Sequence, residues 1–254
     1  IFHLRQRVKH SIIIIIILIN DFKTNKGCCM LFELTDEQRM IRKMVREFTE
    51  NEIKPLDMEM DRNGFNDALW KKIKENGLLE IPLPEQYGGA GGNAITGAIA
   101  LREISRGSAS VAITLDAHWL ATDIVYHHGT EVQKAKYLPM VSEGSIFAFA
   151  LTEPSAGSDA AGIQSTAEFD GSYWILNGTK AWITNGGISD LYIILAKTDE
   201  KKGARGISAF LVEAGTPGFS VGKKEDKMGL RGSVTSELIM NNIRLPKESL
   251  LGRE

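Results

Sequence analysis

The sequence predicts an α+β protein in which an all-α N-terminal domain is followed by a β-domain that forms a barrel or sandwich. Three observations support this prediction. Apolar residues recur at helical spacing until about residue 143. From about residue 145 they fall into short runs that are typical of strands. The helical segments all precede the strand-like ones, which argues against a doubly wound parallel sheet.

The composition describes a globular protein with little net charge. Of 254 residues, 43% are apolar and 24% charged, which allows a packed core and argues against disorder. With 30 Lys and Arg against 32 Asp and Glu the net charge is −2, so we expect no nucleic-acid partner. Cys28 and Cys29 are adjacent, a spacing that excludes a disulfide framework and a usual zinc site, and no metal site is predicted.

Residues 1–29 differ from the rest of the chain. An apolar run, Ile12–Ile19, follows basic residues, as in a secretory signal. A helix of this length rises only about 12 Å, which is too short for a bilayer core of about 30 Å, so we expect no membrane span. We expect Met30 to be the natural start and residues 1–29 to be a leader from upstream translation or a gene-boundary artefact. A targeting peptide is the alternative.

The helical domain is predicted to begin after Thr35, because Thr35 and Gln38 have the form of a capping box. The apolar residues that follow share one helical face: Met40, Ile41, Met44, Val45 and Phe48. Pro55 is expected to end or kink this helix. A second helix is predicted over 66–76, and further helices over 93–143.

Short apolar runs predict the strands of the second half. They cover residues 146–151, 173–176, 179–184, 191–196, 207–212 and 237–243. Between the second and third of these runs lies Asn177-Gly178, the pair most typical of a type I′ turn. The chain is therefore expected to form a hairpin at this point.

Two segments of the β-rich half are the candidates for chemistry. In the first, residues 150–162, an apolar strand runs into a loop of Pro, Gly and Ser whose free amides and hydroxyls could hold a pyrophosphate. In the second, residues 180–187, Trp182 and Thr184 lie on one strand face and suit a flat heteroaromatic ring with polar edges. The alternatives are an ordinary strand-ending loop for the first and a core Trp with a strand-ending Thr for the second.

The two segments together carry a family resemblance. The pattern Thr-Glu-Pro-x-x-Gly-Ser-Asp at 152–159, followed by Trp-Ile-Thr-Asn-Gly-Gly at 182–187, resembles the acyl-CoA dehydrogenase family of flavoenzymes. Further segments that resemble the family lie at residues 34–38, 84–89, 128–131 and 223–229. The resemblance runs from about residue 31 to the last residue, and the sequence is most similar to the short-chain, butyryl-CoA type.

The resemblance implies a helical domain over 31–145 and a middle β-domain over 146–254 that binds FAD. The implied FAD contacts are Phe149, Leu151, Thr152, Gly157, Ser158, Trp182, Ile183 and Thr184. Thr152 would bond the pyrimidine edge of the flavin, and Gly157 and Ser158 the pyrophosphate, with Ser158 also near the acyl-CoA substrate. Trp182 would stack beside the ring, and Thr184 would bond N5, with Ile183 adding a backbone contact.

The implied activity is the FAD-dependent α,β-dehydrogenation of a short-chain acyl-CoA to its trans-2-enoyl-CoA, a step of fatty acid β-oxidation. The electrons would pass to an electron-transferring flavoprotein, and the full-length enzyme would be a homotetramer. The implied location is the cytoplasm in bacteria and the mitochondrial matrix in eukaryotes.

The family places its catalytic carboxylate in a C-terminal four-helix domain, and we expect this chain to lack that domain because it stops at Glu254. We therefore expect no catalytic residue in this chain, and almost no activity from it alone. Glu153 is expected to shape its own loop. The alternatives are an acyl-CoA oxidase of the same superfamily and a non-catalytic fragment that binds flavin or acyl-CoA.

Overall fold

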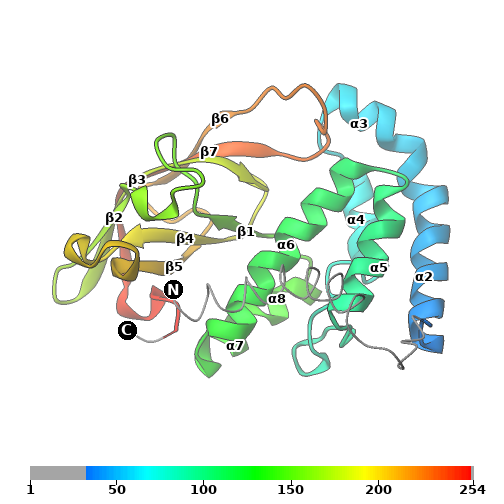
Figure 1. Ribbon diagram of the computed structural model, residues 1–254, viewed down its shortest axis with the longest axis horizontal. Coiled ribbons are helices and arrows are strands. Elements are labelled where there is room, and N and C mark those ends of the chain that lie inside the picture. The colour runs from blue at the N-terminus through cyan, green and yellow to red at the C-terminus, as the bar shows by residue number, and fades with distance from the viewer. Residues whose placement is uncertain (1–32, 253–254) are drawn as a thin grey trace, which may run out of the picture.

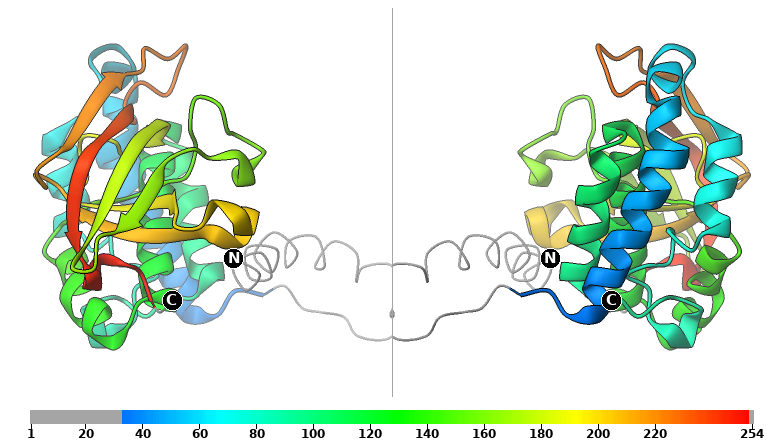
Figure 2. Two further views of the ribbon diagram at one scale, coloured as in Figure 1. Left: turned by 90° about the vertical axis from the view of Figure 1, so that its left-hand side faces the viewer. Right: turned by 90° about the vertical axis from the view of Figure 1, so that its right-hand side faces the viewer.

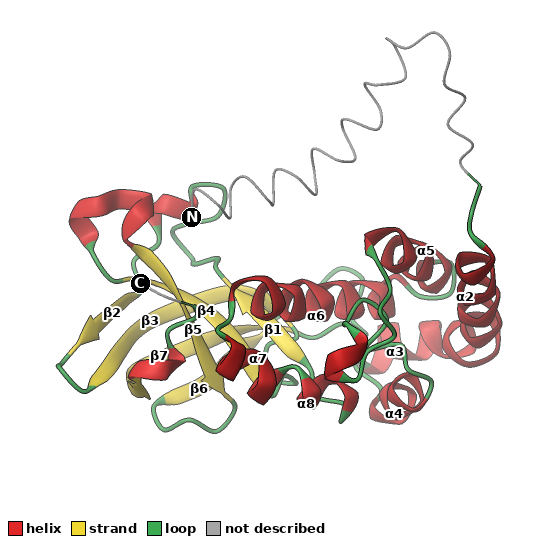
Figure 3. Cartoon of the chain, turned by 90° about the horizontal axis from the view of Figure 1, so that it is seen from below, coloured by secondary structure: helices red, strands yellow, loops and turns green. Residues whose placement is uncertain are grey.

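The computed structural model describes residues 33–252, so the expected leader and Glu254 lie outside the described residues. A helical half and a β half stand side by side along the long axis of the molecule (Figures 1 and 3). The helices come first in the chain and the strands second, as the sequence predicts.

The first helix, α2 (Asp36–Phe48), begins at the predicted capping box: the Thr35 hydroxyl accepts the Gln38 amide, and the Gln38 side chain accepts the Thr35 amide. Pro55 bends the chain without ending the helical path. After Phe48 the backbone continues through a π-type turn and a 3₁₀ turn, Lys54–Leu56, into α3 (Asp57–Asn63).

The remaining helices lie within the predicted ranges. They are α4 (Asp67–Glu75), α5 (Ala94–Ser105), α6 (Ala109–His128), α7 (Glu131–Tyr137) and α8 (Pro139–Ser142). Helix α2 packs against α5, and α5 packs against α6 (Figure 2, right). Helix α6 reaches from this group to the sheet and contacts β1. No helix among residues 33–252 combines the length and the apolar character that a bilayer crossing needs.

The β half is one curled sheet (Figure 2, left). Its strands are β1 (Phe147–Ala150), β2 (Thr166–Phe169), β3 (Tyr173–Thr184), β4 (Leu191–Lys197), β5 (Ile207–Glu213), β6 (Phe219–Lys224) and β7 (Thr235–Pro246). The order is β1-β4-β2-β3-β7-β6, and β5 also pairs with β4. The pairs of β4 with β1 and β2 are parallel, and the others are antiparallel.

The predicted hairpin at Asn177-Gly178 is wrong, because both residues lie inside the continuous strand β3. The glycine is needed for a close approach: a Cβ on Gly178 would lie 2.3 Å from the Ser165 hydroxyl oxygen. Asn177 is used across the strand pair, where its Oδ1 accepts the Asn242 amide at 2.8 Å, beside an irregularity in the β3–β7 register. The actual turn into β3 is formed by Asp170, whose Oδ1 accepts the amides of Ser172 and Tyr173.

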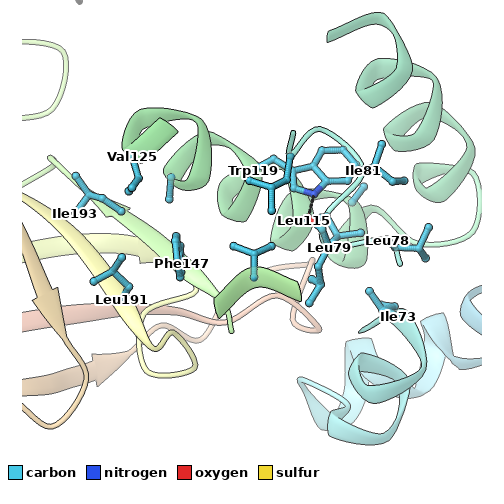
Figure 4. Packing of buried hydrophobic residues seen from close by; sticks show 14 of the residues in the cluster. Ile73, Leu78, Leu79, Ile81, Leu115, Trp119, Val125, Phe147, Leu191 and Ile193 are labelled. Atoms are coloured by element: carbon cyan, nitrogen blue, oxygen red, sulfur yellow. Dashed lines mark hydrogen bonds between the residues drawn. The ribbon is translucent and has the colours of Figure 1, made fainter. Parts of the chain in front are cut away.

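A hydrophobic core continues from the helical half into the sheet. Phe147, Leu191 and Ile193 project from β1 and β4 toward Leu115 and Val125 of α6 (Figure 4). The other face of the same strands builds a second cluster within the curled sheet. Both faces of β1 and β4 are therefore buried. The contact of β1 with α6 holds the sheet against the helical half.

Candidate functional site

The loop that follows β1 lies against β3. The Ala181 amide donates to the Thr152 carbonyl at 2.9 Å, and the Lys180 Nζ donates to the Leu151 carbonyl at 3.1 Å. The loop then projects from the sheet, as the yellow-green segment in Figure 2 shows. The two motif segments that the sequence singles out are therefore neighbours in space.

A buried ion pair joins these two segments. The Lys180 Nζ lies 2.6 Å from the Glu153 Oε1, and both side chains are almost inaccessible to solvent. Glu153 also accepts the amides of Gln164 at 2.5 Å and Ser165 at 3.0 Å. The prediction that Glu153 shapes its loop is confirmed, since its carboxylate holds the two ends of the loop together.

Three kinds of interaction act on the charge state of this pair. Burial raises the pKa of Glu153, but the hydrogen bonds from Lys180 and from two backbone amides outweigh it and hold that pKa below its usual value. Burial lowers the pKa of Lys180, and Glu153 opposes that shift. The Glu153 carboxylate is therefore ionised at neutral pH, and three donors hold it in place.

Trp182 stands on the surface beside this loop. Its side chain is 56% exposed, so the alternative of a core tryptophan is wrong. Its φ of +55° lies in the left-handed region, and a register shift opposite β7 occurs between Lys180 and Ile183. A large apolar ring in a strained and exposed position is costly for a folded protein in isolation, which points to a ligand that covers it.

The two segments also carry polar groups that have no partner within the protein. Among residues 33–252, no hydrogen bond engages the hydroxyls of Thr152, Ser158 and Thr184, or the amides of Gly157 and Ser158. The space at Gly157 is open, because a Cβ there would meet no atom within 4 Å. A flat apolar plate with free donors at its edge and along an open loop fits the ring and pyrophosphate of FAD.

The other predicted contacts take more buried positions. Phe149 and Leu151 are half-buried and pack against the core shared with the helices. Ile183 is buried in the sheet cluster, and its carbonyl accepts the Gly186 amide. No hydrogen bond or ring contact joins the loop end at Gly157–Ser158 to Trp182 in the described part of the chain. The structure thus brings Thr152 to β3, while Gly157 and Ser158 lie farther along the loop.

Two buried polar residues, for which the sequence predicted no role of their own, fix the far end of β3. Asn185, with φ +66°, donates its side-chain amide to the carbonyls of Thr114 at 2.9 Å and Phe147 at 3.5 Å. His118 of α6 accepts the Phe147 amide on Nδ1 at 3.0 Å, and burial lowers its pKa to about 3. These contacts attach Thr184, the last residue of β3, to α6 and β1.

No cluster of three or more His, Cys, Asp or Glu side chains suited to a metal ion exists within residues 33–252. Sequence patterns alone did not reveal Asn185, because its partners are carbonyls of distant elements. Lys180 carried a usable signal: it falls on the inward register of β3 with Trp174 and Leu176, where a lysine needs a buried partner.

Comparisons with known proteins agree with this site. The model of the acyl-CoA dehydrogenase N-terminal domain matches residues 35–145, and that of the middle domain matches residues 148–243. The short-chain specific acyl-CoA dehydrogenase of Clostridium acetobutylicum is 44% identical over 228 residues, which cover 89% of this chain and 60% of the relative.

Two solved structures share the fold. Butyryl-CoA dehydrogenase from Megasphaera elsdenii superposes with a TM-score of 0.85 at 41% identity, covering 89% of this chain and 61% of that one. A glutaryl-CoA dehydrogenase from Mycobacterium smegmatis in complex with FADH2 gives 0.79 at 38%, covering 86% and 56%. The chain spans about 60% of the length of these relatives. With two family models matched in order over most of its length, the chain belongs to the acyl-CoA dehydrogenase family.

Proposed function

We propose that this chain carries the FAD-binding part of an enzyme that oxidises the Cα–Cβ bond of a short-chain acyl-CoA to the trans-2-enoyl-CoA. The observation that carries the proposal is the backbone bond between Ala181 and Thr152, which joins the loop of Thr152 to the strand that bears the exposed Trp182. The short-chain preference is supported by the named specificities of the Clostridium and Megasphaera relatives.

In this proposal the chain's own residues bind and orient the cofactor. The indole of Trp182 covers the ring system and excludes water, while Thr152 and Thr184 donate to its polar edges. The free amides and hydroxyl at Gly157 and Ser158 hold the pyrophosphate, and Ser158 also lies near the acyl-CoA. When bound, FAD supplies the acceptor for the hydride that leaves the β-carbon.

Proton removal from the α-carbon is assigned to no residue described above. Glu153, the acid of the motif, is buried and ion-paired with Lys180, so we do not assign it to a proton of the substrate. General acid–base catalysis is typically worth about 10²–10⁴-fold. We therefore expect the isolated polypeptide of residues 30–254 to bind flavin and to turn over acyl-CoA at least about a hundredfold more slowly than an intact family enzyme.

The resemblance also suggests the partners of the whole enzyme. Electrons would pass to an electron-transferring flavoprotein, since the proposed flavin lies against an exposed face of the β half. A homo-oligomer is proposed for the full-length enzyme, on the family resemblance alone.

The test of cofactor binding is a titration of the purified chain with FAD, followed by flavin fluorescence. We expect Trp182→Ala to weaken FAD binding at least about tenfold, because the stacked ring is lost. Tyr173→Ala is the matched control, since Tyr173 is an exposed aromatic at the other end of β3 and should leave FAD affinity unchanged. A chain that binds no FAD, or equal losses in the two variants, would contradict the proposal.

Anaerobic addition of butyryl-CoA to the flavin-loaded chain separates the remaining functions. Slow bleaching of the flavin is the expected result. Bleaching followed by rapid peroxide formation in air would favour an acyl-CoA oxidase. Bound flavin that butyryl-CoA never bleaches would favour a non-catalytic binding fragment.

A further inference from the structure

The buried pair of Glu153 and Lys180 takes part in none of the reaction steps above. Each ion loses its hydration on burial, and apolar residues of similar volume often replace such a pair without loss of stability. The pair also joins the loop after β1 to β3, because Glu153 belongs to this loop and Lys180 belongs to β3. Stability alone therefore does not explain why charges occupy this place.

The hydrogen bonds of the pair reach both ends of the loop. Glu153 accepts the amides of Gln164 and Ser165, where the chain returns to β2, and Lys180 donates to the Leu151 carbonyl, where the chain leaves β1. One more bond, from Ala181 to Thr152, completes the attachment. The loop is thus closed on itself and fastened to β3 by two neighbouring residues, Lys180 and Ala181.

This point of attachment lies between the proposed cofactor contacts. Thr152 stands between Leu151 and Glu153 in the chain, and Trp182 follows Lys180 by two residues. A shift of the ion pair would therefore change the distance between the Thr152 hydroxyl and the Trp182 ring. An apolar pair could fill the volume, but it could not accept two amides and donate to a carbonyl at the same time.

We propose that Glu153 and Lys180 are positioning residues that set the loop of Thr152 against the strand of Trp182 and so preform the FAD site. This inference rests on the proposed function, because it assigns the pair a purpose in binding the cofactor. It makes a separate claim about the chain without cofactor: the loop should lose its position when the pair is broken, even where the fold survives.

Two variants separate position from stability. Lys180→Met leaves a buried carboxylate without its ion partner, so it should lower both stability and FAD affinity. The double variant E153Q/K180M removes both charges and should recover part of the lost stability, because glutamine keeps one acceptor oxygen for the two amides. Because methionine cannot donate to the Leu151 carbonyl, it should not recover FAD affinity, and we expect the dissociation constant to stay at least about tenfold above that of the unaltered chain.

Arg46→Met is the matched control. It breaks another ion pair with a buried carboxylate, Glu103, but in the helical half and far along the chain from the loop. It should destabilise the fold while leaving the FAD dissociation constant within about twofold of normal.

Three measurements decide the matter: urea unfolding, FAD titration, and amide hydrogen exchange of residues 151–165 in the chain without FAD. The proposal is supported if exchange in this segment rises in both Lys180 variants but not in Arg46→Met, and if FAD affinity stays low in the double variant. It is overturned if FAD affinity recovers with stability, or if loop exchange in Lys180→Met rises no more than in Arg46→Met. An unaltered chain that binds no FAD would refute the proposed function, and the exchange data would still test the positioning of the loop.

Discussion

An asparagine at a helix end in the helical half bonds to backbone groups a few residues away, whereas a buried asparagine at the end of β3 finds its partners far along the chain. Asn93 caps α5 by accepting the amides of Ile95 and Thr96. Asn185, by contrast, donates to a carbonyl 71 residues away. The same residue type therefore has a local task in one half and a long-range task in the other.

Backbone strain is distributed in the same way. Within residues 33–252, the non-glycine residues with positive φ are Trp182, Asn185, Leu230 and Asn242, all in the β half. Two of them flank Thr184. Such conformations cost of order 1–3 kcal/mol each and persist where the surrounding structure enforces them. The comparison indicates that the helices are built for stability and that the end of β3 is built around a site.

The largest expected difference between the halves comes from removing an asparagine in each. Asn185→Ala should lower the free energy of unfolding by about 3 kcal/mol, since it removes a buried hydrogen bond and leaves alanine in the left-handed region. Asn93→Ala, which removes only a helix cap, should lower it by about 1 kcal/mol. Urea unfolding measures both, and equal losses would show that the halves do not differ in this way.

A smaller effect is expected from pH, through the histidine at the boundary of the two halves. His118 has a pKa of about 3 when folded and about 6.5 when unfolded, so the unfolded chain binds its proton first. The stability it supports is complete above the unfolded pKa and is lost as pH falls from about 6.5 toward 3. Between pH 7.5 and 5.5 the loss should be about 1.4 kcal/mol.

His118→Gln is the control for this titration. The variant should be less stable at pH 7.5 but should lose less stability than the unaltered chain on going to pH 5.5. Carboxylates with lowered pKa values, such as Glu103 and Glu153, contribute only at lower pH. An unchanged pH dependence in the variant would exclude His118 as the origin.

The smallest expected effect is a gain in stability when glycine, in place of alanine, replaces a strained residue. Trp182→Gly and Trp182→Ala both delete the exposed ring, but only glycine adopts a positive φ without strain. The glycine variant should be more stable than the alanine variant by about 0.5–1 kcal/mol, while both bind FAD poorly. If alanine were as stable as glycine, the backbone at this position would not be strained.

Local signals predicted the helical half well and the β half in part. The capping box at Thr35 follows from neighbours in sequence, and it is found. Asn177-Gly178 has an equally strong local signal, yet long-range pairing of β3 with β7 overrides it. Strands β2 and β6 were missed because they are short or lie at the sheet edge, with too few apolar residues to show a pattern.

The residues of the candidate site could be predicted from the sequence, but the contacts that position them could not. The motif residues located the loop of Thr152 and the strand of Trp182 because their types suit a ring and a pyrophosphate. That these segments touch through Ala181 depends on the curl of the sheet, which periodicity does not encode. The exposure of Trp182 depends on the register irregularity beside it, which only the pairing with β7 reveals.

Phe147 lies at the boundary between the two family domains and is bonded to both halves of the molecule. Both backbone polar groups of Phe147 are bonded by side chains from elsewhere, one from α6 and one from beyond β3, and its ring sits in the core that the halves share. Exchange of one domain for that of a distant homologue would have to preserve the hydrogen bonds to Phe147 and its place in the shared core. We expect the two modules to melt in a single cooperative transition and to be inherited as one unit.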